Sequence, residues 1–499
     1  MSRTIKLVLN SGLSLFYQIV VVISGFVLPP LIIKYYGSSA NGLVASISNF
    51  LAFFALTEMG MGAVVRASLY KPLAMNDSVE ISKVLLSSRK FFTKIGVFLL
   101  LYTIVLIFVF PFISESCFDF VSTAILIAAI AIGSISQYLF GIVYDQLLNA
   151  SQRAYVSLVI SSLVVVLTTI VSVVLIWHNY SLHVVKIATA GIFVFKPLLL
   201  QLYVKKIYKI DFSVSYEGEP IKQKWNGLAQ HFATYVLKHS DIVVLTFFSN
   251  LKIVSIYYVY HLISNGLQSI VSSLSNGFYS LLGDMYAKKE EDLLKRTFSL
   301  FEFIIHTSVA IMFSVVFLLI LPFVHVYTME AHDANYIQPL FAYIFLMATM
   351  FFCVRTPYYI MVQSAGHFKE TQNSAIYEVL INVVVSITLV FNYDLVGVAI
   401  GTLLAMIYRT FYLAHYLSKN VLYLPFTNFL KRVIIDVVCV MVCFKIGSIF
   451  SLQCNDYFAF FVLGIKIIFF CTLLSLGINI VTCPSDFKAL MRYIKCKSL

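Results

Sequence analysis

A row of ionisable and polar side chains follows one face of an otherwise apolar stretch, residues 226–249. Residues three and four apart share a helix face, so His231, Tyr235 and Lys238 form one stripe. Asp241 lies one turn beyond Lys238. A lysine in apolar surroundings needs an anion, which is either Asp241 or a bound ligand. Two interpretations follow: a Lys–Asp pair that only holds helices together, or a cationic contact for an anionic molecule.

A second polar row lies in the next apolar stretch, residues 253–283. One histidine on such a face is usually a hydrogen-bonded packing residue, whereas several aligned polar side chains favour a wall that faces water. We therefore expect this row to line a cavity, together with His231 and Tyr235 of the stretch 226–249, a milder row in the first apolar stretch and one residue of the second. The predicted cavity-lining residues are Asn10, Ser14, Tyr17, Asn49, His231, Tyr235, His261, Asn265, Gln268 and Ser272.

Several single charges are also embedded in apolar stretches. Arg66 is interpreted as an anchor near one end of its stretch, and Glu58 as either a proton-titrating group or a hydrogen-bonded packing residue. Arg355 precedes Pro357, and an arginine suits bidentate contacts with phosphate. Glu302 and His306 lie at a similar depth and are predicted to pair with Arg355. Further embedded charges are Lys196, Glu378, Arg409, Lys445 and Lys466.

The elements that position these residues are membrane-spanning helices. The chain of 499 residues is 60% hydrophobic and 12% charged, more apolar surface than a soluble protein can bury. A span needs ~20 apolar residues. We predict an all-α integral membrane protein with about fourteen spans at 9–33, 41–68, 92–113, 119–146, 154–177, 181–204, 226–249, 253–283, 299–327, 335–362, 374–392, 395–417, 432–451 and 457–482.

The charges of the linkers predict how the chain is oriented. Linkers rich in Lys and Arg alternate along the chain with linkers poor in these residues. The poor linkers hold only Lys34, Lys186 and Lys252. Under the positive-inside rule, both termini are cytoplasmic and the number of spans is even. The net charge of +12 then reflects membrane anchors and not a nucleic-acid partner. The first apolar run lacks a cleavage site and is expected to be retained.

Catalytic and metal-binding patterns are missing from the sequence. The eight cysteines are scattered, with only Cys439 and Cys443 close together, so neither a metal site nor a disulfide framework is expected. No phosphate loop, HExxH or GxSxG occurs. No hydrophilic segment exceeds about 25 residues, too few for a soluble catalytic domain. We predict a non-enzyme without cofactors.

A weak internal repeat suggests the domain organisation. Asn10–Gly12 opens the first span and Asn226–Gly227 opens the seventh, each followed by a polar-striped helix and a basic linker. Such repeats are common in transporters. We expect one six-helix lobe at 1–205, a linker at 206–221, a second lobe at 222–420, and a terminal helix pair with a basic tail at 421–499.

Four stretches carry a family resemblance: FLAFFALTEMGMG (50–62), SLYKPLA (68–74), DIVVLTFF (241–248) and VSIYYVY (254–260). The first two look like the second span and the following linker of bacterial polysaccharide flippases of the Wzx type, and the last two look like the seventh and eighth spans of that family. This resemblance implies the multidrug/oligosaccharidyl-lipid/polysaccharide exporter fold. In that fold two six-helix lobes surround a central cavity with alternating access, and fourteen-span members carry two further helices.

The resemblance also implies a function. It predicts translocation of undecaprenyl-diphosphate-linked oligosaccharide from the cytoplasmic to the outer leaflet of the bacterial inner membrane, for O-antigen or capsular polysaccharide. Lys238, Arg355 and Arg66 match the family's cationic contacts, and Glu58, Asp241 and Glu378 are candidates for ion coupling. Polysaccharide polymerase and chain-length regulator are the implied partners, and the protein is expected to be a monomer.

Three other functions compete with this one. A cation-coupled drug antiporter of the same superfamily would need a cavity dominated by carboxylates. A membrane glycosyltransferase or polymerase would need larger outside loops than this chain has. A non-transporting component of polysaccharide synthesis would have no need of a polar interior.

Overall fold

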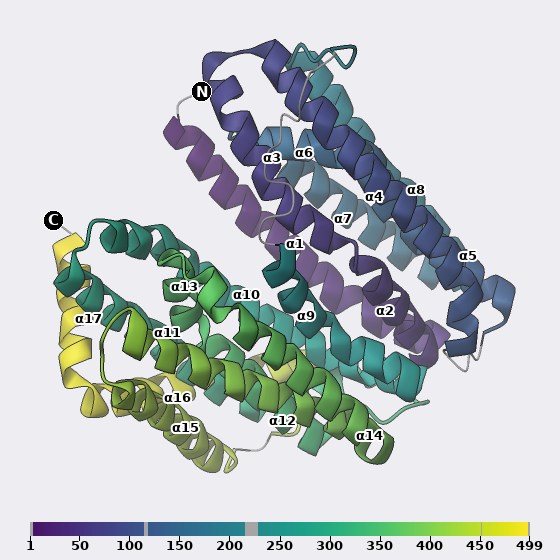
Figure 1. Cartoon of the computed structure of the whole chain (residues 1–499). Coiled ribbons are helices and arrows are strands. Elements are labelled where there is room, and N and C mark those ends of the chain that lie inside the picture. Colours follow the sequence, from purple (N-terminus) through teal and green to yellow (C-terminus); the bar gives the residue numbers. More distant parts are fainter. Residues whose placement is uncertain (1–2, 114–117, 215–227, 451, 498–499) are drawn as a thin grey trace. The chain divides into compact units, whose positions relative to one another are not determined.

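The computed structural model describes residues 3–113, 118–214, 228–450 and 452–497, which are helical with short connections and contain no strand (Figure 1). The side chains of Glu58 and His231 lie outside the described part. The chain divides into two compact units, Met1–Ser255 and Ile256–Leu499. We call them the first and the second unit and describe each by itself.

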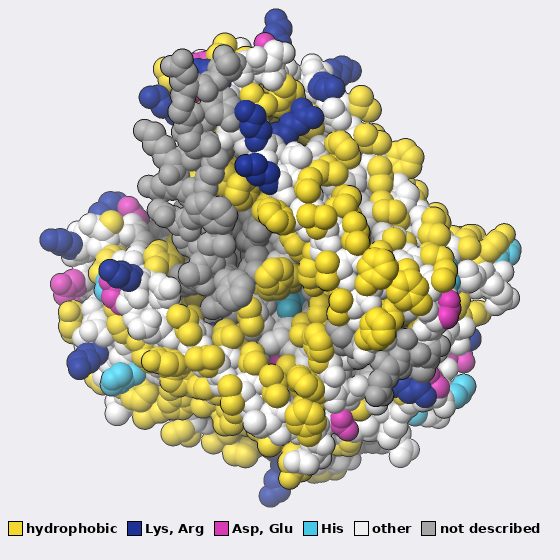
Figure 2. Space-filling view, turned by 45° about the vertical axis from the view of Figure 1, so that its right-hand side comes forward, with side chains coloured by type: hydrophobic (Ala, Val, Ile, Leu, Met, Phe, Trp, Pro, Cys, Tyr) yellow, Lys and Arg dark blue, Asp and Glu magenta, His cyan; other side chains and the backbone are white. Residues whose placement is uncertain are grey.

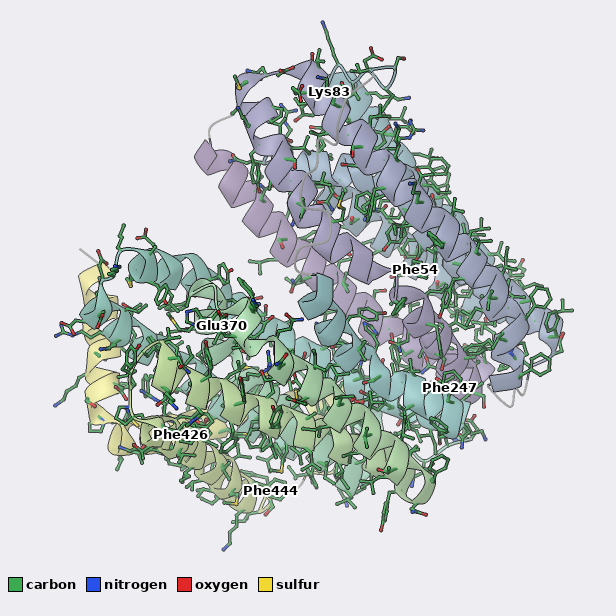
Figure 3. All side chains as sticks on the ribbon, in the orientation of Figure 1. Phe54, Lys83, Phe247, Glu370, Phe426 and Phe444 are labelled. Carbon is green, nitrogen blue, oxygen red and sulfur yellow. The ribbon has the colours of Figure 1, made fainter. Side chains whose placement is uncertain are left out.

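The first unit is built around apolar faces of its helices. Its buried core includes Leu43, Phe92, Phe110, Leu126 and Leu147. Aromatic rings extend this core; Phe54 lies 5.3 Å from Tyr102 and Phe247 lies 5.9 Å from Phe50, measured between ring centroids (Figure 3). The elements are α1 (Arg3–Tyr36), α2 (Ser38–Ala52), α3 (Ala55–Met75), α4 (Ser78–Ile113), α5 (Phe120–Ser136), the π-helix η1 (Gln137–Gly141), α6 (Ile142–Ala150), α7 (Ala154–Trp177), α8 (Leu182–Ile207) and α9 (Leu228–Phe248).

The second unit begins within the next helix, shortly after its first turn. Its elements are most of α10 (Leu251–Ala287), then α11 (Glu291–Tyr327), α12 (Pro339–Val354), α13 (Thr356–Ser364), α14 (Phe368–Asn420), α15 (Phe426–Gly447), α16 (Tyr457–Thr482) and α17 (Pro484–Lys497). α11 is central because α12, α13, α15, α16 and α17 all pack against it. One apolar cluster joins Leu318 and Val326 of α11 to Cys443 of α15 and Ile467 of α16.

The predicted fold class is confirmed: the described chain is all-α, and every predicted span overlaps a helix. Nine helices of the described residues are long and apolar enough to cross a membrane. One of them, α14, contains two predicted spans. The predicted spans 41–68, 226–249, 253–283 and 432–451 also overlap helices, but these helices are not among the nine. The structure also contains α17, which was expected only as a basic tail.

α14 is a helical hairpin, although its 53 residues run without a linker. Asp394 has φ 42° and ψ −119°, outside the helical region, and it reverses the chain. Asn382 Nδ2 in one half donates to Thr402 Oγ1 in the other at 3.0 Å. A Cβ on Gly397 would lie 2.6 Å from the Leu389 carbonyl, so glycine is required where the halves approach.

Two predicted single helices are broken in the structure. The span 41–68 divides into α2 and α3 around Phe53–Phe54, and the span 335–362 divides into α12 and α13 at Arg355. The second break has a clear cause, because Pro357 lacks an N–H and fits only the first turn of a helix.

Large apolar side chains cover much of the surface. Figure 2 shows broad hydrophobic areas on the face in view, with few Lys and Arg side chains among them. Phe112, Phe458 and Phe469 are among the most exposed side chains. Exposing such apolar surface to water costs a free energy of roughly 25 cal/mol per Å², whereas exposing it to lipid does not. Together with the apolar helices, this surface is that of a multi-pass membrane protein.

Close packing in the first unit gives a testable prediction at Gly42. A Cβ there would lie 2.7 Å from the carbonyl carbon of Leu251, a backbone atom that cannot rotate away. We expect Gly42→Ala to destabilise the protein by about 2 kcal/mol or more, as overpacking does. The check is thermal unfolding of the detergent-purified protein. Gly191→Ala is the control, because its Cβ meets nothing within 4 Å; an equal loss in both variants would contradict the prediction.

Candidate functional site

Polar side chains of α2 pair with α9 and the start of α10, all within the first unit. Asn41 Nδ2 donates to Ser255 Oγ at 2.8 Å, and Ser46 shares a hydrogen bond of 2.8 Å with Thr246. Asn49 Nδ2 donates to the His239 carbonyl at 2.9 Å. Because an unpaired polar group in hydrocarbon is costly, these interhelical hydrogen bonds stabilise the packing of the helices.

Two of the predicted lining residues meet at one end of this row. The Tyr235 hydroxyl donates to the Asn49 carbonyl at 3.4 Å, and the Asn49 side chain also contacts the His239 ring. The Tyr235 and His239 rings stack with centroids 4.0 Å apart. The structure therefore brings Asn49 and Tyr235 together, both buried against neighbouring helices.

Lys238 and Asp241 differ in their surroundings although both lie on α9. The Lys238 side chain is exposed, while Asp241 is only 3% exposed. Of the two stripe residues whose side chains are described, Tyr235 and Lys238, Lys238 is the exposed one. Its charge on an exposed face of an apolar helix is the feature expected of a contact for an anionic group.

The polar row of α1 is directed at its neighbours in the first unit. Asn10 Oδ1 accepts from the Tyr155 amide at 2.7 Å, and Asn10 Nδ2 donates to the Gln152 carbonyl at 3.3 Å. Asn10 therefore holds the turn between α6 and α7. Ser14 and Tyr17 are half-buried. Arg66 of α3 donates through Nη1 to Gln146 Oε1 of α6 at 2.6 Å.

α10 presents a polar face within the second unit. Asn265 and Ser272 are exposed there, and Ser269 and Ser273 lie exposed beside them. The exposed aliphatic side chains Ile270, Leu274 and Leu281 fall on a different arc of the helix. An exposed polar arc beside an exposed apolar arc is typical of a helix that meets both water and lipid.

The other predicted residues of α10 border this polar face. His261 is half-buried; its Nδ1 lies 3.1 Å from Asn265 Nδ2, and its ring stacks on Tyr257. Gln268 donates to Ser264 Oγ at 3.1 Å, and Ser264 in turn bonds Thr349 of α12 at 2.8 Å. These bonds hold the row in place and leave its outer side open.

Arg355 and Glu378 are joined in a buried triad. Arg355 of the α12–α13 break forms an ion pair with Glu378 of α14, and Arg409 Nε lies 3.8 Å from the other carboxylate oxygen. Arg409 Nη1 also donates to the Thr371 carbonyl at 2.9 Å. The predicted pairing of Arg355 with Glu302 and His306 is wrong, because Glu378 lies closer to it in the fold. One residue predicted for phosphate contact, Arg355, and one predicted for ion coupling, Glu378, are thus each other's partners in the structure.

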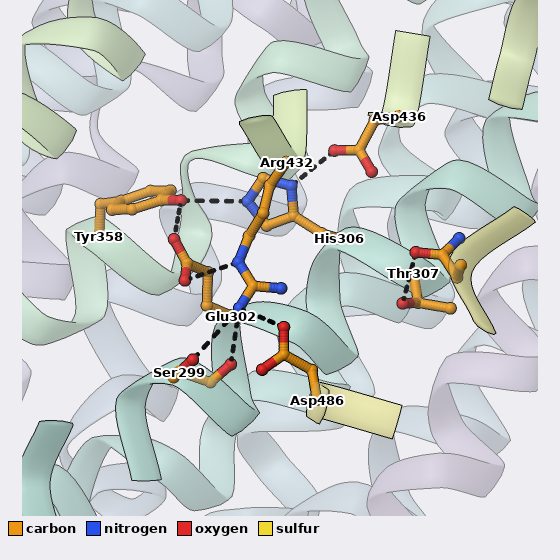
Figure 4. A network of polar contacts seen from close by, with 9 residues as sticks. Ser299, Glu302, His306, Thr307, Tyr358, Arg432, Asp436 and Asp486 are labelled. Atoms are coloured by element: carbon orange, nitrogen blue, oxygen red, sulfur yellow. Dashed lines mark hydrogen bonds and ion pairs between the residues drawn. The ribbon is translucent and has the colours of Figure 1, made fainter. Parts of the chain in front are cut away.

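Glu302 and His306 belong to a second buried network, which joins α11, α13, α15 and α17 (Figure 4). Arg432 Nε donates to Glu302 at 2.9 Å, and the Tyr358 hydroxyl donates to the same carboxylate at 2.5 Å. His306 Nδ1 lies 2.5 Å from Asp436, and its Nε2 lies 3.1 Å from the Tyr358 hydroxyl.

The edge of this network reaches α17 and a small cavity. Arg432 Nη2 lies 3.2 Å from Asp486 of α17 and 3.2 Å from Ser299 Oγ. A cavity of about 90 Å³ lies against Glu302, Tyr358 and Arg432. Its walls continue over Lys295 of α11, the end of α14 and the start of α15. The space is sufficient for a few water molecules beside the carboxylate.

Sequence reasoning missed Tyr358, Arg432, Asp436 and Asp486 as members of this network. One signal was available: Glu302 and His306 are four residues apart, as are Arg432 and Asp436. Two ionisable pairs at that spacing inside apolar helices indicate two faces that need each other.

Comparison with solved structures identifies the fold. The lipid II flippase MurJ in an inward closed conformation superposes with a TM-score of 0.70 at 17% identity, covering 95% of this chain and 99% of that one. An inward-facing multidrug resistance MATE transporter of the MOP superfamily gives 0.59 at 16% identity, covering 80% and 94%. The MATE multidrug transporter DinF-BH, solved as a complex, gives 0.55 at 15% identity, covering 84% and 97%.

No protein-family model matches the chain. No curated protein matches it by sequence either. The structural likeness extends over nearly the whole of both chains in the flippase comparison. This multi-pass membrane protein therefore has the fold of the MOP-type transporters and flippases.

Proposed function

We propose that this protein is a flippase, which moves undecaprenyl-diphosphate-linked oligosaccharide from the cytoplasmic to the outer leaflet for O-antigen or capsular polysaccharide. The observation that carries the proposal is the whole-chain likeness to a lipid II flippase, which covers 95% of this chain, whereas the two MATE transporters named above cover 80% and 84% of it. The likeness of short stretches to polysaccharide flippases favours an oligosaccharide cargo.

The exposed polar surfaces support a large polar cargo. A sugar that leaves water loses hydrogen bonds to water, and the side chains of Asn265, Ser269 and Ser272 of α10 would replace these bonds. The prenyl tail would stay in lipid. Lys238 is exposed and suits the diphosphate. A phosphate could bind Arg355 only by displacing Glu378 from it. We therefore propose Lys238 as the main contact for the diphosphate. Arg66 would act at the inner mouth, where Gln146 already holds it.

The proposed setting follows from the linker charges. We place the protein in the bacterial inner membrane with both termini in the cytoplasm, acting by alternating access as a monomer. Its product would pass to a polysaccharide polymerase and a chain-length regulator. Glu58, Asp241 and Glu378 remain the proposed ion-coupling groups from the sequence, and Asp241 is buried as such a group requires.

A drug antiporter is the second candidate, favoured by the likeness to multidrug transporters of the MATE family. The deciding experiment measures the sidedness of lipid-linked oligosaccharide in cells depleted of the protein. Accumulation in the cytoplasmic leaflet together with loss of surface glycan is the expected result. Unchanged lipid-linked sugars with altered drug sensitivity would replace the flippase with the antiporter.

A further inference from the structure

Residues 208–214, which follow α8, pack against one end of the first unit; Lys83 marks this end of α4 in Figure 3. Tyr208, Ile210 and Phe212 lie against the apolar core of the unit. Between the last two, the amide of residue 211 donates to the hydroxyl of Ser82 of α4 at 3.1 Å. We call residues 208–214 the docked segment. Its alternate apolar side chains and its hydrogen bond to α4 make it a fixed part of the first unit.

Two arginines from other parts of the first unit stack on rings of the docked segment. The guanidinium carbon of Arg89 of α4 lies 5.0 Å from the centroid of the Phe212 ring. The guanidinium carbon of Arg153, in the turn between α6 and α7, lies 5.7 Å from the centroid of the Tyr208 ring, and the neutral hydroxyl of Tyr203 lies beside it. A guanidinium that stacks by its face keeps N–H donors along its edge. The two rings therefore orient two cationic groups toward an acceptor.

The positive charge at this end of the unit exceeds the negative charge. Among the residues that the structure describes, Arg89 and Arg153 form no ion pair. Lys83 is paired with Glu80 at 2.6 Å, so that pair adds no net charge. Asp211 is the acid of the docked segment. The other exposed cations around it are Lys94, Lys205, Lys206 and Lys209. Two oriented guanidinium groups within an excess of positive charge are suited to an anion.

Both arginines lie at the level of the lipid head groups. Arg89 lies just before the predicted span 92–113, Arg153 lies directly before 154–177, and Lys205 lies directly after 181–204. Head groups flank the hydrocarbon core at the ends of such spans. In the proposed orientation this end faces the cytoplasmic leaflet, and anionic lipids give that leaflet its negative surface potential. A lipid phosphate can therefore reach the two arginines without leaving the bilayer.

We propose that Arg89, Arg153 and the docked segment form a binding site for the phosphate head group of an anionic phospholipid. The edges of the guanidinium groups donate to phosphate oxygens, which arginine can contact through two parallel hydrogen bonds. The surrounding lysines favour a lipid with net negative charge, because the cation of a zwitterionic head group would be repelled. A lipid bound there stabilises the docked segment on α4 and on the turn before α7. The site needs no cargo and does not depend on the proposed function.

The test is a lipid titration of the purified full-length protein, followed by native mass spectrometry. The probes are phosphatidylglycerol and phosphatidylcholine with the same acyl chains. We expect phosphatidylglycerol to bind about tenfold or more tightly than phosphatidylcholine, because a hydrogen bond to a charged group is worth about that factor. Equal binding of the two lipids to the wild type would overturn the proposal.

The double variant Arg89→Gln/Arg153→Gln should lose this preference for phosphatidylglycerol. Both arginines lie at the surface of the unit, so we expect the variant to fold, and its elution as a monodisperse species checks this. Arg296→Gln is the matched control, because Arg296 is an exposed arginine at the start of α11 in the second unit. It should keep the preference. A double variant that keeps the preference, or an equal loss in the control, would overturn the site.

Two further measurements test the orientation of the arginines and the source of the phosphate. Phe212→Leu keeps the apolar packing and all charges but removes the ring under Arg89, and we expect weaker binding of phosphatidylglycerol. Unchanged binding would overturn the role of the ring. Inorganic phosphate at the same concentration as the lipid should not displace phosphatidylglycerol, because it lacks the acyl chains that stay in the bilayer. Displacement would show a site for free anions and would overturn the assignment to a lipid.

Discussion

Glu378→Ala is expected to leave little folded protein. The substitution would strand Arg355 and Arg409, two buried cations that share this one carboxylate. Removing one partner of a buried ion pair typically costs about 3–5 kcal/mol. The total stability of a typical protein is only about 5–15 kcal/mol, so the loss is a large share of it. The measurement is the fraction of monodisperse detergent-solubilised protein that survives a heating series.

The control for Glu378→Ala removes the whole triad. Arg355→Met/Glu378→Leu/Arg409→Met replaces three buried charges with apolar side chains of similar volume, which is often neutral or stabilising. We expect this variant to recover most of the folded protein. If Glu378→Ala instead stays folded at wild-type levels and loses transport, Glu378 acts in ion coupling and the triad is not needed for stability.

Lys238→Ala should reduce surface glycan by on the order of tenfold or more while the protein remains folded. A hydrogen bond to a charged group contributes roughly 1.5–3 kcal/mol, and 1.4 kcal/mol is a factor of ten. Lys238 is exposed, so its truncation leaves no buried charge without a partner. The readout is surface glycan normalised to membrane-inserted protein in complemented cells.

Two further variants test whether the effect of Lys238→Ala is specific to this residue and its charge. Lys238→Arg keeps the charge and should retain most of the glycan. Lys252→Ala removes another exposed lysine of the first unit, one that lies near an end of its helix, and should have little effect. Normal glycan in Lys238→Ala would exclude this residue from cargo binding, and equal losses in both alanine variants would indicate a general charge effect.

The helices could be predicted from the sequence because their cause is local. An apolar run of sufficient length must become a helix in lipid, since every backbone polar group needs an internal partner. The break expected at residues 392–395 coincides with the reversal at Asp394. α17 was missed because its composition is polar on average, and its position depends on packing against α11 and α16.

The partners of the embedded charges could not be predicted in the same way. Periodicity indicates which residues share a face but not what that face meets. Arg355 and Glu302 were expected at a similar depth in the membrane and therefore as partners. In the fold, Arg355 pairs with Glu378, and Glu302 pairs with Arg432. Likewise, the row on α1 was recognised as polar, but the use of Asn10 to hold a turn between two other helices depends on tertiary contacts.

The hairpin of α14 has a consequence for how the chain is made. Its halves are joined at a single residue, so neither can enter the bilayer long before the other. Asn382 and Thr402 are only twenty positions apart and satisfy one another. At a synthesis rate of about 5–20 residues per second, this polar pair can form within seconds of translation. The hairpin can therefore leave the insertion machinery as one unit with these polar groups already paired, before α15 and α16 exist.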